Sequence, residues 1–310
     1  MRMLLPLPLL VVLLLMSPST RADSLLITDA LMFIGDASDP VTQDIHIVEG
    51  KIEATGADLS TLTVDTVIDA GGRPVTPALF AGITEAGLSE IGMVYEAVDS
   101  RLSNLYTGLM HPEFDVRKAY NPYSSVIPVT RVEGYGYTLL MSAPGDRTIS
   151  GQGSLVRFDG GFDSFEGKTT VYLNVDGRSG GEVGGSRAAH WMLLETAFSS
   201  LVSKQSTGLW SPHNDHALLN QTGKAALRGI SQEGLFIFHA NRASDINQVL
   251  QFSAKHQLSS VISGGQEAWI VRDALAEAGV PVVLNALDNL PGSFDGLGAR
   301  LDNAALLHEA

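Results

Sequence analysis

The chain contains no cysteine among its 310 residues. Disulfide bonds and thiolate-held metal clusters are therefore excluded, so the folded state must be stabilised by its core or by a bound partner. Basic residues are also few, because 20 Lys and Arg stand against 34 Asp and Glu, a formal net charge of −14. Proteins bind phosphate backbones through clusters of Lys and Arg. A nucleic-acid partner is therefore not expected, which leaves small molecules as the expected ligands or substrates.

Long apolar runs are confined to the N-terminus. Arg2 precedes an apolar run of 13 residues, Leu4 to Met16, and small residues flank a cleavage site after Ala22. A membrane-spanning helix needs roughly 20 apolar residues. We therefore expect residues 1–22 to be a signal peptide, with a membrane anchor as the alternative. The mature protein is then expected in the periplasm, without a stable membrane span.

Two nucleotide- or phosphate-binding motifs are also missing. The glycine runs around Gly151, Gly180 and Gly264 lack the Lys-Ser/Thr pair of a phosphate-binding loop, and none forms a GxGxxG after a first strand. We interpret them as turns.

The first part of the mature chain reads as short strands joined by polar turns. Glu49-Gly50 is flanked on both sides by alternating apolar and polar residues, which predicts a β-hairpin. A β unit of about 50 residues buries little apolar surface. We assign residues 23–77 to a small N-terminal β-sandwich part and residues 78–310 to a second domain.

From Ser186 onward the pattern becomes helical and then alternates. Ser186 is a candidate N-cap of the first of these helices. The alternation comprises strand 235–240, helix 244–257, strand 259–264, helix 266–279, strand 281–287 and helix 301–310. Strands alternating with helices of this length predict right-handed βαβ units and a parallel sheet.

The stretch VIDAGGRPVTPALFAGIT, residues 67–84, carries a family resemblance. It resembles the junction of the amidohydrolase superfamily, where an N-terminal β-sandwich leads into the first strand of a (β/α)8 barrel. The segments NRASDI, GGQEAW, PVVLNALDNLP and FDGLGARLDNAALL resemble the C-terminal half of exported imidazolonepropionase-type members. The resemblance implies an α/β fold with a (β/α)8 TIM barrel. Because residue 310 ends a predicted helix, we expect this barrel to be truncated before its eighth strand; a complete protein with an open α/β sheet is the alternative.

The resemblance also implies a chemistry. The family hydrolyses carbon–nitrogen bonds other than peptide bonds, using one or two divalent metals such as zinc to activate water. Its members bind metal through a His-x-His pair at the end of the first strand, where this chain has Gly82, Ile83 and Thr84. His239, at the end of the strand 235–240, matches a metal-binding histidine of the family. A histidine that forms hydrogen bonds within its own loop is the alternative interpretation of His239.

The remaining polar residues at strand ends are candidate pocket residues. We assign Thr84, Asn241, Arg242 and Glu267 to a ligand or substrate pocket and assign no catalytic residue. The cluster of residues 213–216, His-Asn-Asp-His, fits a solvated loop better than a metal site, because its spacing matches no usual zinc pattern. Two hypotheses follow: an exported amidohydrolase with a degenerate metal site, a possible pseudoenzyme, or a non-catalytic periplasmic binding or assembly protein.

Overall fold

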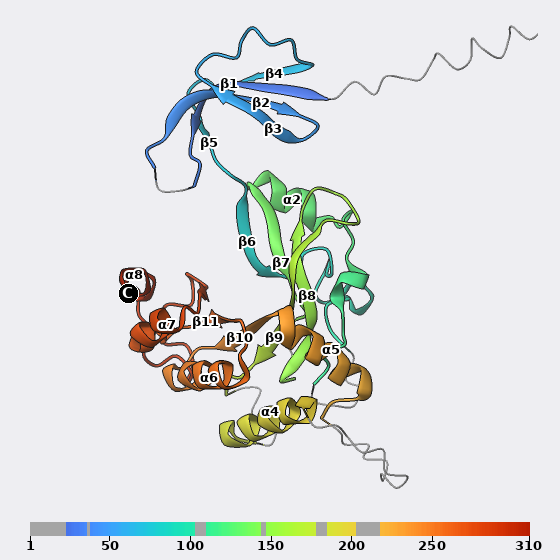
Figure 1. Cartoon of the computed structure of the whole chain (residues 1–310), viewed down its shortest axis with the longest axis vertical. Coiled ribbons are helices and arrows are strands. Elements are labelled where there is room, and N and C mark those ends of the chain that lie inside the picture. Colours follow the sequence, from blue (N-terminus) through green and yellow to red (C-terminus); the bar gives the residue numbers. More distant parts are fainter. Residues whose placement is uncertain (1–22, 36–37, 103–109, 144–146, 178–184, 203–217) are drawn as a thin grey trace, which may run out of the picture. The chain divides into compact units, whose positions relative to one another are not determined.

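The computed structural model describes residues 23–35, 38–102, 110–143, 147–177, 185–202 and 218–310 (Figure 1). The predicted signal peptide and the cluster at 213–216 lie outside these residues. Two compact units divide the chain between Pro77 and Ala78. Within the described ranges, no helix combines the length and the apolar character that crossing a membrane requires.

The first unit is a single five-stranded sheet with the order β3-β2-β1-β4, and β5 also pairs with β1. Its strands are β1 (Ser24–Met32), β2 (Val41–Val48), β3 (Lys51–Gly56), β4 (Thr66–Asp69) and β5 (Pro74–Val75). The predicted hairpin is confirmed, since β2 and β3 pair antiparallel around Glu49 and Gly50. Both residues have left-handed φ values, 50° and 74°, as a tight two-residue hairpin turn requires.

The second unit contains a seven-stranded sheet with the order β12-β11-β10-β9-β8-β7-β6. Its strands are β6 (Leu79–Thr84), β7 (Tyr135–Leu140), β8 (Ile149–Arg157), β9 (Phe165–Asn174), β10 (Leu235–Ala240), β11 (Ser260–Gly264) and β12 (Val282–Leu284). All run in one direction except β8, which is antiparallel to both neighbours. The sheet is barrel-like and nearly closed, so the predicted α/β class is confirmed.

Helices follow the strands as the sequence pattern predicts. They are α2 (Val126–Val132), α4 (Arg187–Val202), α5 (Gln221–Glu233), α6 (Ala243–His256), α7 (Arg272–Ala278) and α8 (Asn303–Glu309), with short 3₁₀ turns η1 (Tyr95–Ala97), η2 (Val116–Ala119) and η3 (Ala268–Val271). The predicted cap of α4 is confirmed, since the Ala189 amide donates to Ser186 Oγ at 3.2 Å. Such a bond satisfies one of the amides that a helix N-terminus leaves without an internal partner.

The main core lies between the helices and one face of the sheet. Phe236 and Phe238 of β10 are buried against side chains of α4, α5 and α6, including Phe198 and Phe252. The intervening residue Ile237 belongs to a second cluster on the opposite face. This alternation with period two is the geometry of a strand. It assigns one face of β10 to the helices and the other to the interior of the barrel-like sheet.

Three local features differ from what the residues alone favour. The nearly all-apolar run 78–84 favours a strand buried on both faces, but Leu79 and Phe80 are exposed because β6 is an edge strand that pairs only with β7 in the described part of the chain. Gly151 and Gly153 were expected in a turn, yet they lie inside β8. A Cβ on Gly153 would meet the carbonyl oxygen of Leu140 at 1.8 Å, so glycine is there because the backbones approach closely.

The third feature is Pro128, a residue type that usually interrupts a helix. Helix α2 forms nevertheless, with Pro128 in its first turn. The amides of a first turn have no partner within the helix, so proline costs little at this position.

Candidate functional site

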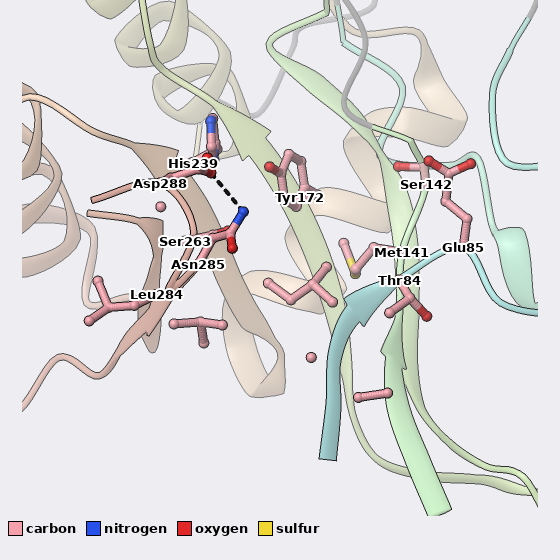
Figure 2. A pocket seen from close by; sticks show the side chains of 15 residues that line it. Thr84, Glu85, Met141, Ser142, Tyr172, His239, Ser263, Leu284, Asn285 and Asp288 are labelled. Atoms are coloured by element: carbon pink, nitrogen blue, oxygen red, sulfur yellow. Dashed lines mark hydrogen bonds between the residues drawn. The ribbon is translucent and has the colours of Figure 1, made fainter. Parts of the chain in front are cut away.

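A cavity of about 500 Å³ opens in the interior of the barrel-like sheet (Figure 2). It is lined by residues from β6, β9, β10, β11 and β12 and from the segments that directly follow β6, β7 and β12. The lining residues are Ala81, Gly82, Ile83, Thr84, Glu85, Met141, Ser142, Tyr172, His239, Ser263, Gly264, Val283, Leu284, Asn285 and Asp288. The carboxyl ends of parallel strands converge here, which is where barrel folds of this kind place their functional groups.

The strand registers explain why these side chains meet. His239 lies opposite Ser263 on β11 and opposite Asn174 on β9. Tyr172, two residues before Asn174, therefore faces the same side of the sheet as Asn174 does. The rings of Tyr172 and His239 are stacked, with centroids 6.3 Å apart and an interplanar angle of 22°. One wall of the cavity is therefore formed by two stacked rings, those of Tyr172 and His239, which carry polar atoms at their edges.

His239 is held by polar neighbours at the ends of β9 and β10. Its Nε2 lies 3.7 Å from Asp176 Oδ2 and 3.4 Å from the Asn241 side-chain nitrogen. Asp176 is buried, and its amide donates to Asn174 Oδ1 at 3.2 Å. A carboxylate at this position orients the imidazole ring.

Tyr172 is a hydroxyl donor at neutral pH. Burial raises the pKa of Tyr172 well above its ordinary value, and the charge of Asp176 raises it further. A hydrogen bond to Ser263 acts in the opposite direction and lowers that pKa. The phenol therefore remains protonated and able to donate at any pH at which the protein works.

The first-strand position that carries metal ligands in the resembled family has no ligand here. Gly82 has a φ of +82°, in the left-handed region where a side chain adds strain. The strand register shifts between Phe80 and Ile83, so Gly82 lies in a bulge. Thr84 lines the cavity, but its oxygen forms a hydrogen bond of 2.8 Å with Thr138 Oγ1 and accepts from the Ala86 amide at 3.2 Å. At this end of the site, the Thr84 side chain therefore forms hydrogen bonds within the protein and stabilises the local backbone.

Glu85 and Ser142 form a polar corner next to this bulge. Figure 2 shows the two side chains on the same side of the cavity, away from His239. The Glu85 carboxylate accepts a hydrogen bond of 2.5 Å from the hydroxyl of Ser100, which is fully buried. Ser142 is 2% exposed, and its oxygen has no hydrogen-bond partner among the described residues.

The far wall comes from the loop after β12. Asn285 donates a hydrogen bond of 2.8 Å from its side-chain nitrogen to Asp288 Oδ2, and the Leu287 amide donates to Asn285 Oδ1 at 3.1 Å. Figure 2 shows Asn285, Asp288 and His239 on the same side of the cavity. The cavity therefore carries one carboxylate on each of two opposing walls.

The residues assigned from the sequence separate into two groups. Thr84 and His239 line the cavity, whereas Asn241, Arg242 and Glu267 do not belong to its lining. Asn241 contacts the His239 ring but does not line the cavity, and Arg242 is exposed at the N-terminus of α6. Glu267 is buried, and its two oxygens accept from the amides of Ala243 at 3.0 Å and Gly298 at 2.8 Å.

The donor atoms of the described residues do not fit the metal centre that the resemblance implies. A zinc site needs three or four ligands at about 2.0–2.3 Å. In the part of the chain that the structure describes, no group of three or more His, Asp or Glu is arranged to hold a metal ion. His239 and Asp176 make a pair only, and neither Gly82 nor Thr84 supplies an imidazole. No step of a reaction is therefore assigned to a metal.

Several cavity residues were not assigned from the sequence. They are Glu85, Ser142, Tyr172, Ser263, Asn285 and Asp288. Glu85, Ser142 and Asn285 each follow closely after the end of a strand, which is the signal that singled out His239. Applying this rule to every strand would have found them. Tyr172 lies inside β9, so only its register with β10 assigns it to the cavity.

Comparison with known proteins bears on the fold. No protein-family model matches the chain, and no curated protein matches it. Among solved structures, an amidohydrolase from Thermotoga maritima MSB8 is similar with a TM-score of 0.76 and 18% identity, over 92% of this chain and 76% of that one. The fold is therefore amidohydrolase-like. At this identity the likeness establishes the fold alone.

Two further structures are less similar. Another amidohydrolase has a TM-score of 0.44 and 14% identity, over 92% of this chain and 76% of that one. An N-acyl-D-glutamate deacylase from Bordetella bronchiseptica, solved with zinc and a phosphonate inhibitor, has a TM-score of 0.40 and 13% identity, over 84% and 57%. Neither likeness is close enough to bear on the site.

Proposed function

We propose that this protein is an amidohydrolase-type protein that binds a small polar molecule with a carbon–nitrogen bond in the cavity of its barrel-like sheet. One observation carries the proposal: the cavity of about 500 Å³ lies at the carboxyl ends of strands in a fold that matches a solved amidohydrolase at a TM-score of 0.76. Cavities of this size and position are typical of small-molecule sites in barrel folds. Hydrolysis of carbon–nitrogen bonds is the reaction of this class of protein.

The residues that would orient such a molecule come from three walls. Tyr172 donates from its phenol and Ser142 from its hydroxyl, so both can bind a carbonyl oxygen. His239, backed by Asp176 at 3.7 Å, is the group best placed to accept a proton from water. These contributions come from the chain itself and do not need the metal centre of the resembled family.

Metal content and hydrolysis, measured together, test the proposal. The full-length protein is expressed with zinc and manganese in the medium and assayed on a panel of cyclic amides and N-acyl compounds. From the donor set we expect less than about a tenth of an equivalent of metal per chain. Binding of a panel member in thermal-shift measurements, lost in His239→Ala but not in the exposed His308→Ala, supports the cavity as the site. A panel that is neither bound nor hydrolysed contradicts the proposal.

A second candidate function is a non-catalytic periplasmic binding or assembly protein. It is favoured by the pairing of Thr84 with Thr138 at 2.8 Å, because this hydroxyl occupies a position at which the resembled family binds metal. On this hypothesis panel members bind without turnover. Retained metal that disappears in His239→Ala, together with hydrolysis, would exclude it and would establish a metal-dependent hydrolase instead.

We further propose that the protein is an exported, imidazolonepropionase-like member of its class. The motifs at residues 67–84 and the four C-terminal segments support the subgroup, and the composition of residues 1–22 supports export. N-terminal sequencing of the protein recovered from the periplasm tests the location. A mature N-terminus at Asp23 is expected, and an intact Met1 would contradict export with cleavage.

A further inference from the structure

The charges that line the cavity are of one sign. Glu85 lies on one wall and Asp288 on the other, and the described lining contains neither lysine nor arginine. Among the described lining residues, His239 is the only one whose side chain can carry positive charge, and its Nε2 lies 3.7 Å from Asp176 Oδ2. The whole chain is acidic as well, with 34 Asp and Glu against 20 Lys and Arg. Walls of one charge sign concentrate counter-ions of the opposite sign in a cleft.

A second observation, independent of the charges, points to a ligand at the Glu85 wall. Ser142 lines the cavity, and its Oγ is buried and has no hydrogen-bond partner among the described residues. A buried hydroxyl without a partner is costly, and the cost is removed when a ligand supplies the missing bond. The Glu85 carboxylate is on the same side of the cavity (Figure 2).

The rest of the lining at this end is apolar. Ile83 and Met141 border the polar corner, and the ring of Tyr172 lies further along the same interior. An organic body of modest size would bury its surface against these three side chains. The polar corner therefore offers two hydrogen-bond acceptors, Glu85 and Ser142, beside an apolar wall.

We propose that the cavity binds a small organic cation, a protonated amine with an apolar body. Glu85 and Ser142 Oγ accept hydrogen bonds from the ammonium group, Ile83 and Met141 contact the body, and Asp288 adds a favourable charge from the opposite wall. A carboxylate ligand is rejected, because it would meet two carboxylates and no lysine or arginine among the described lining residues. The inference rests on the proposed function only in placing the ligand in the same cavity.

Three probes of one shape and different charge test the inference: benzylamine, benzyl alcohol and benzoate, each titrated calorimetrically into the full-length protein. We expect benzylamine to bind and benzoate not to bind. Glu85→Gln is expected to weaken benzylamine binding at least about tenfold, because a hydrogen bond to a charged group is lost. The variant keeps the fold, since an amide oxygen still accepts from Ser100. Ser142→Ala is expected to weaken binding about fivefold.

Glu90→Gln is the matched control. Glu90 also accepts a hydrogen bond from a serine hydroxyl, Ser125 at 2.7 Å, but it is exposed and lies outside the cavity lining. The inference is overturned if benzylamine does not bind, if benzoate binds as well as benzylamine, or if Glu90→Gln weakens binding as much as Glu85→Gln. Binding of a neutral or anionic amide in the cavity, with no binding of benzylamine, would overturn this inference and leave the proposed function standing.

Discussion

Thr84 donates its hydroxyl hydrogen to Thr138, and the direction of this bond follows from the next one. Thr138 gives its single hydrogen to the carbonyl oxygen of Gly82 at 2.8 Å, so it accepts in the 2.8 Å bond between the two hydroxyls. The hydrogen of Thr84 is therefore used within the protein. This arrangement stabilises the bulge at Gly82 and makes Thr84 a poor donor to any ligand.

Thr138→Val is therefore expected to destabilise the protein more than Thr84→Val. Thr138 is fully buried, and its replacement leaves the Gly82 carbonyl without this donor and the Thr84 hydroxyl hydrogen without its acceptor. We expect about 2–3 kcal/mol for Thr138→Val and about 1 kcal/mol for Thr84→Val in the free energy of unfolding. Urea denaturation of the two variants and of the double variant measures this. Equal losses, or losses that simply add, would show that the hydroxyls are not coupled.

Glu267 is predicted to act on stability and not on ligand binding. Both of its oxygens accept from backbone amides, so Glu267→Gln places an amide NH₂ against a donor and removes negative charge from the N-terminus of α6. We expect a loss of about 2 kcal/mol in unfolding free energy with unchanged affinity for any ligand of the cavity. Glu277→Gln, on the exposed face of α7, is the control and should cost almost nothing. If Glu267→Gln lost ligand affinity at unchanged stability, Glu267 would have to be assigned to the ligand pocket.

The fold could be predicted from the sequence in the region where strands and helices alternate. Residues 235–284 follow period two in the strands and helical spacing between them, and their order in the sheet matches their order in the chain. β8 was harder, because its glycines at 151 and 153 look like a turn, and only close packing against β7 and Phe114 explains them. Local propensity cannot report such a contact, since the partner lies elsewhere in the chain.

Less of the site could be predicted from the sequence, because it too depends on contacts between distant segments. The sequence identifies His239 because it lies at the end of a strand, and it identifies the substitutions at Gly82 and Thr84. It does not show that Glu267 satisfies two amides or that Tyr172 stacks on His239, since both depend on registers between distant segments. Side chains at strand ends were predictable as candidates, but their division into cavity residues and structural residues required the structure.

Arg187 is predicted to hold three segments together. It donates to Asp245 at 2.8 Å and is paired with Asp295, whose other oxygen accepts from the Gly177 amide at 2.9 Å. Asp245 is buried, and burial raises its pKa despite the opposing effect of Arg187. Arg187→Met leaves this carboxylate buried without its cation, and we expect a loss of about 3 kcal/mol in unfolding free energy at neutral pH.

The same variant should recover stability as the pH falls. A carboxyl group with a raised pKa in the folded state binds its proton more readily there than in the unfolded chain, so acid favours the folded variant. Adding Asp245→Asn should likewise restore most of the loss. Arg131→Met, on the exposed end of α2, is the control. A loss that is equal at all pH values, or that persists in the double variant, would contradict the assignment.

His190 gives the wild-type protein a pH dependence of its own. Burial lowers the pKa of His190 to about 4, although the charge of Asp176 acts to raise it. Because the folded pKa lies below the unfolded value of about 6.5, the unfolded chain binds a proton first. Stability is therefore full above about pH 6.5 and falls as the pH decreases toward 4, by about 3 kcal/mol at most. Below pH 4 this group causes no further loss.

Replacing His190 separates this effect from the titration of carboxylates. In His190→Leu, which keeps a buried side chain of similar size, the unfolding free energy should no longer fall between pH 6.5 and pH 4 by the amount that wild type loses. His308→Leu, on the exposed helix α8, should keep the wild-type profile. Chemical denaturation at closely spaced pH values measures all three proteins. If the His190 variant follows the wild-type curve, the buried imidazole is not the group that titrates, and the acid sensitivity belongs to carboxylates whose pKa is lowered in the folded state, such as Glu113 and Glu195.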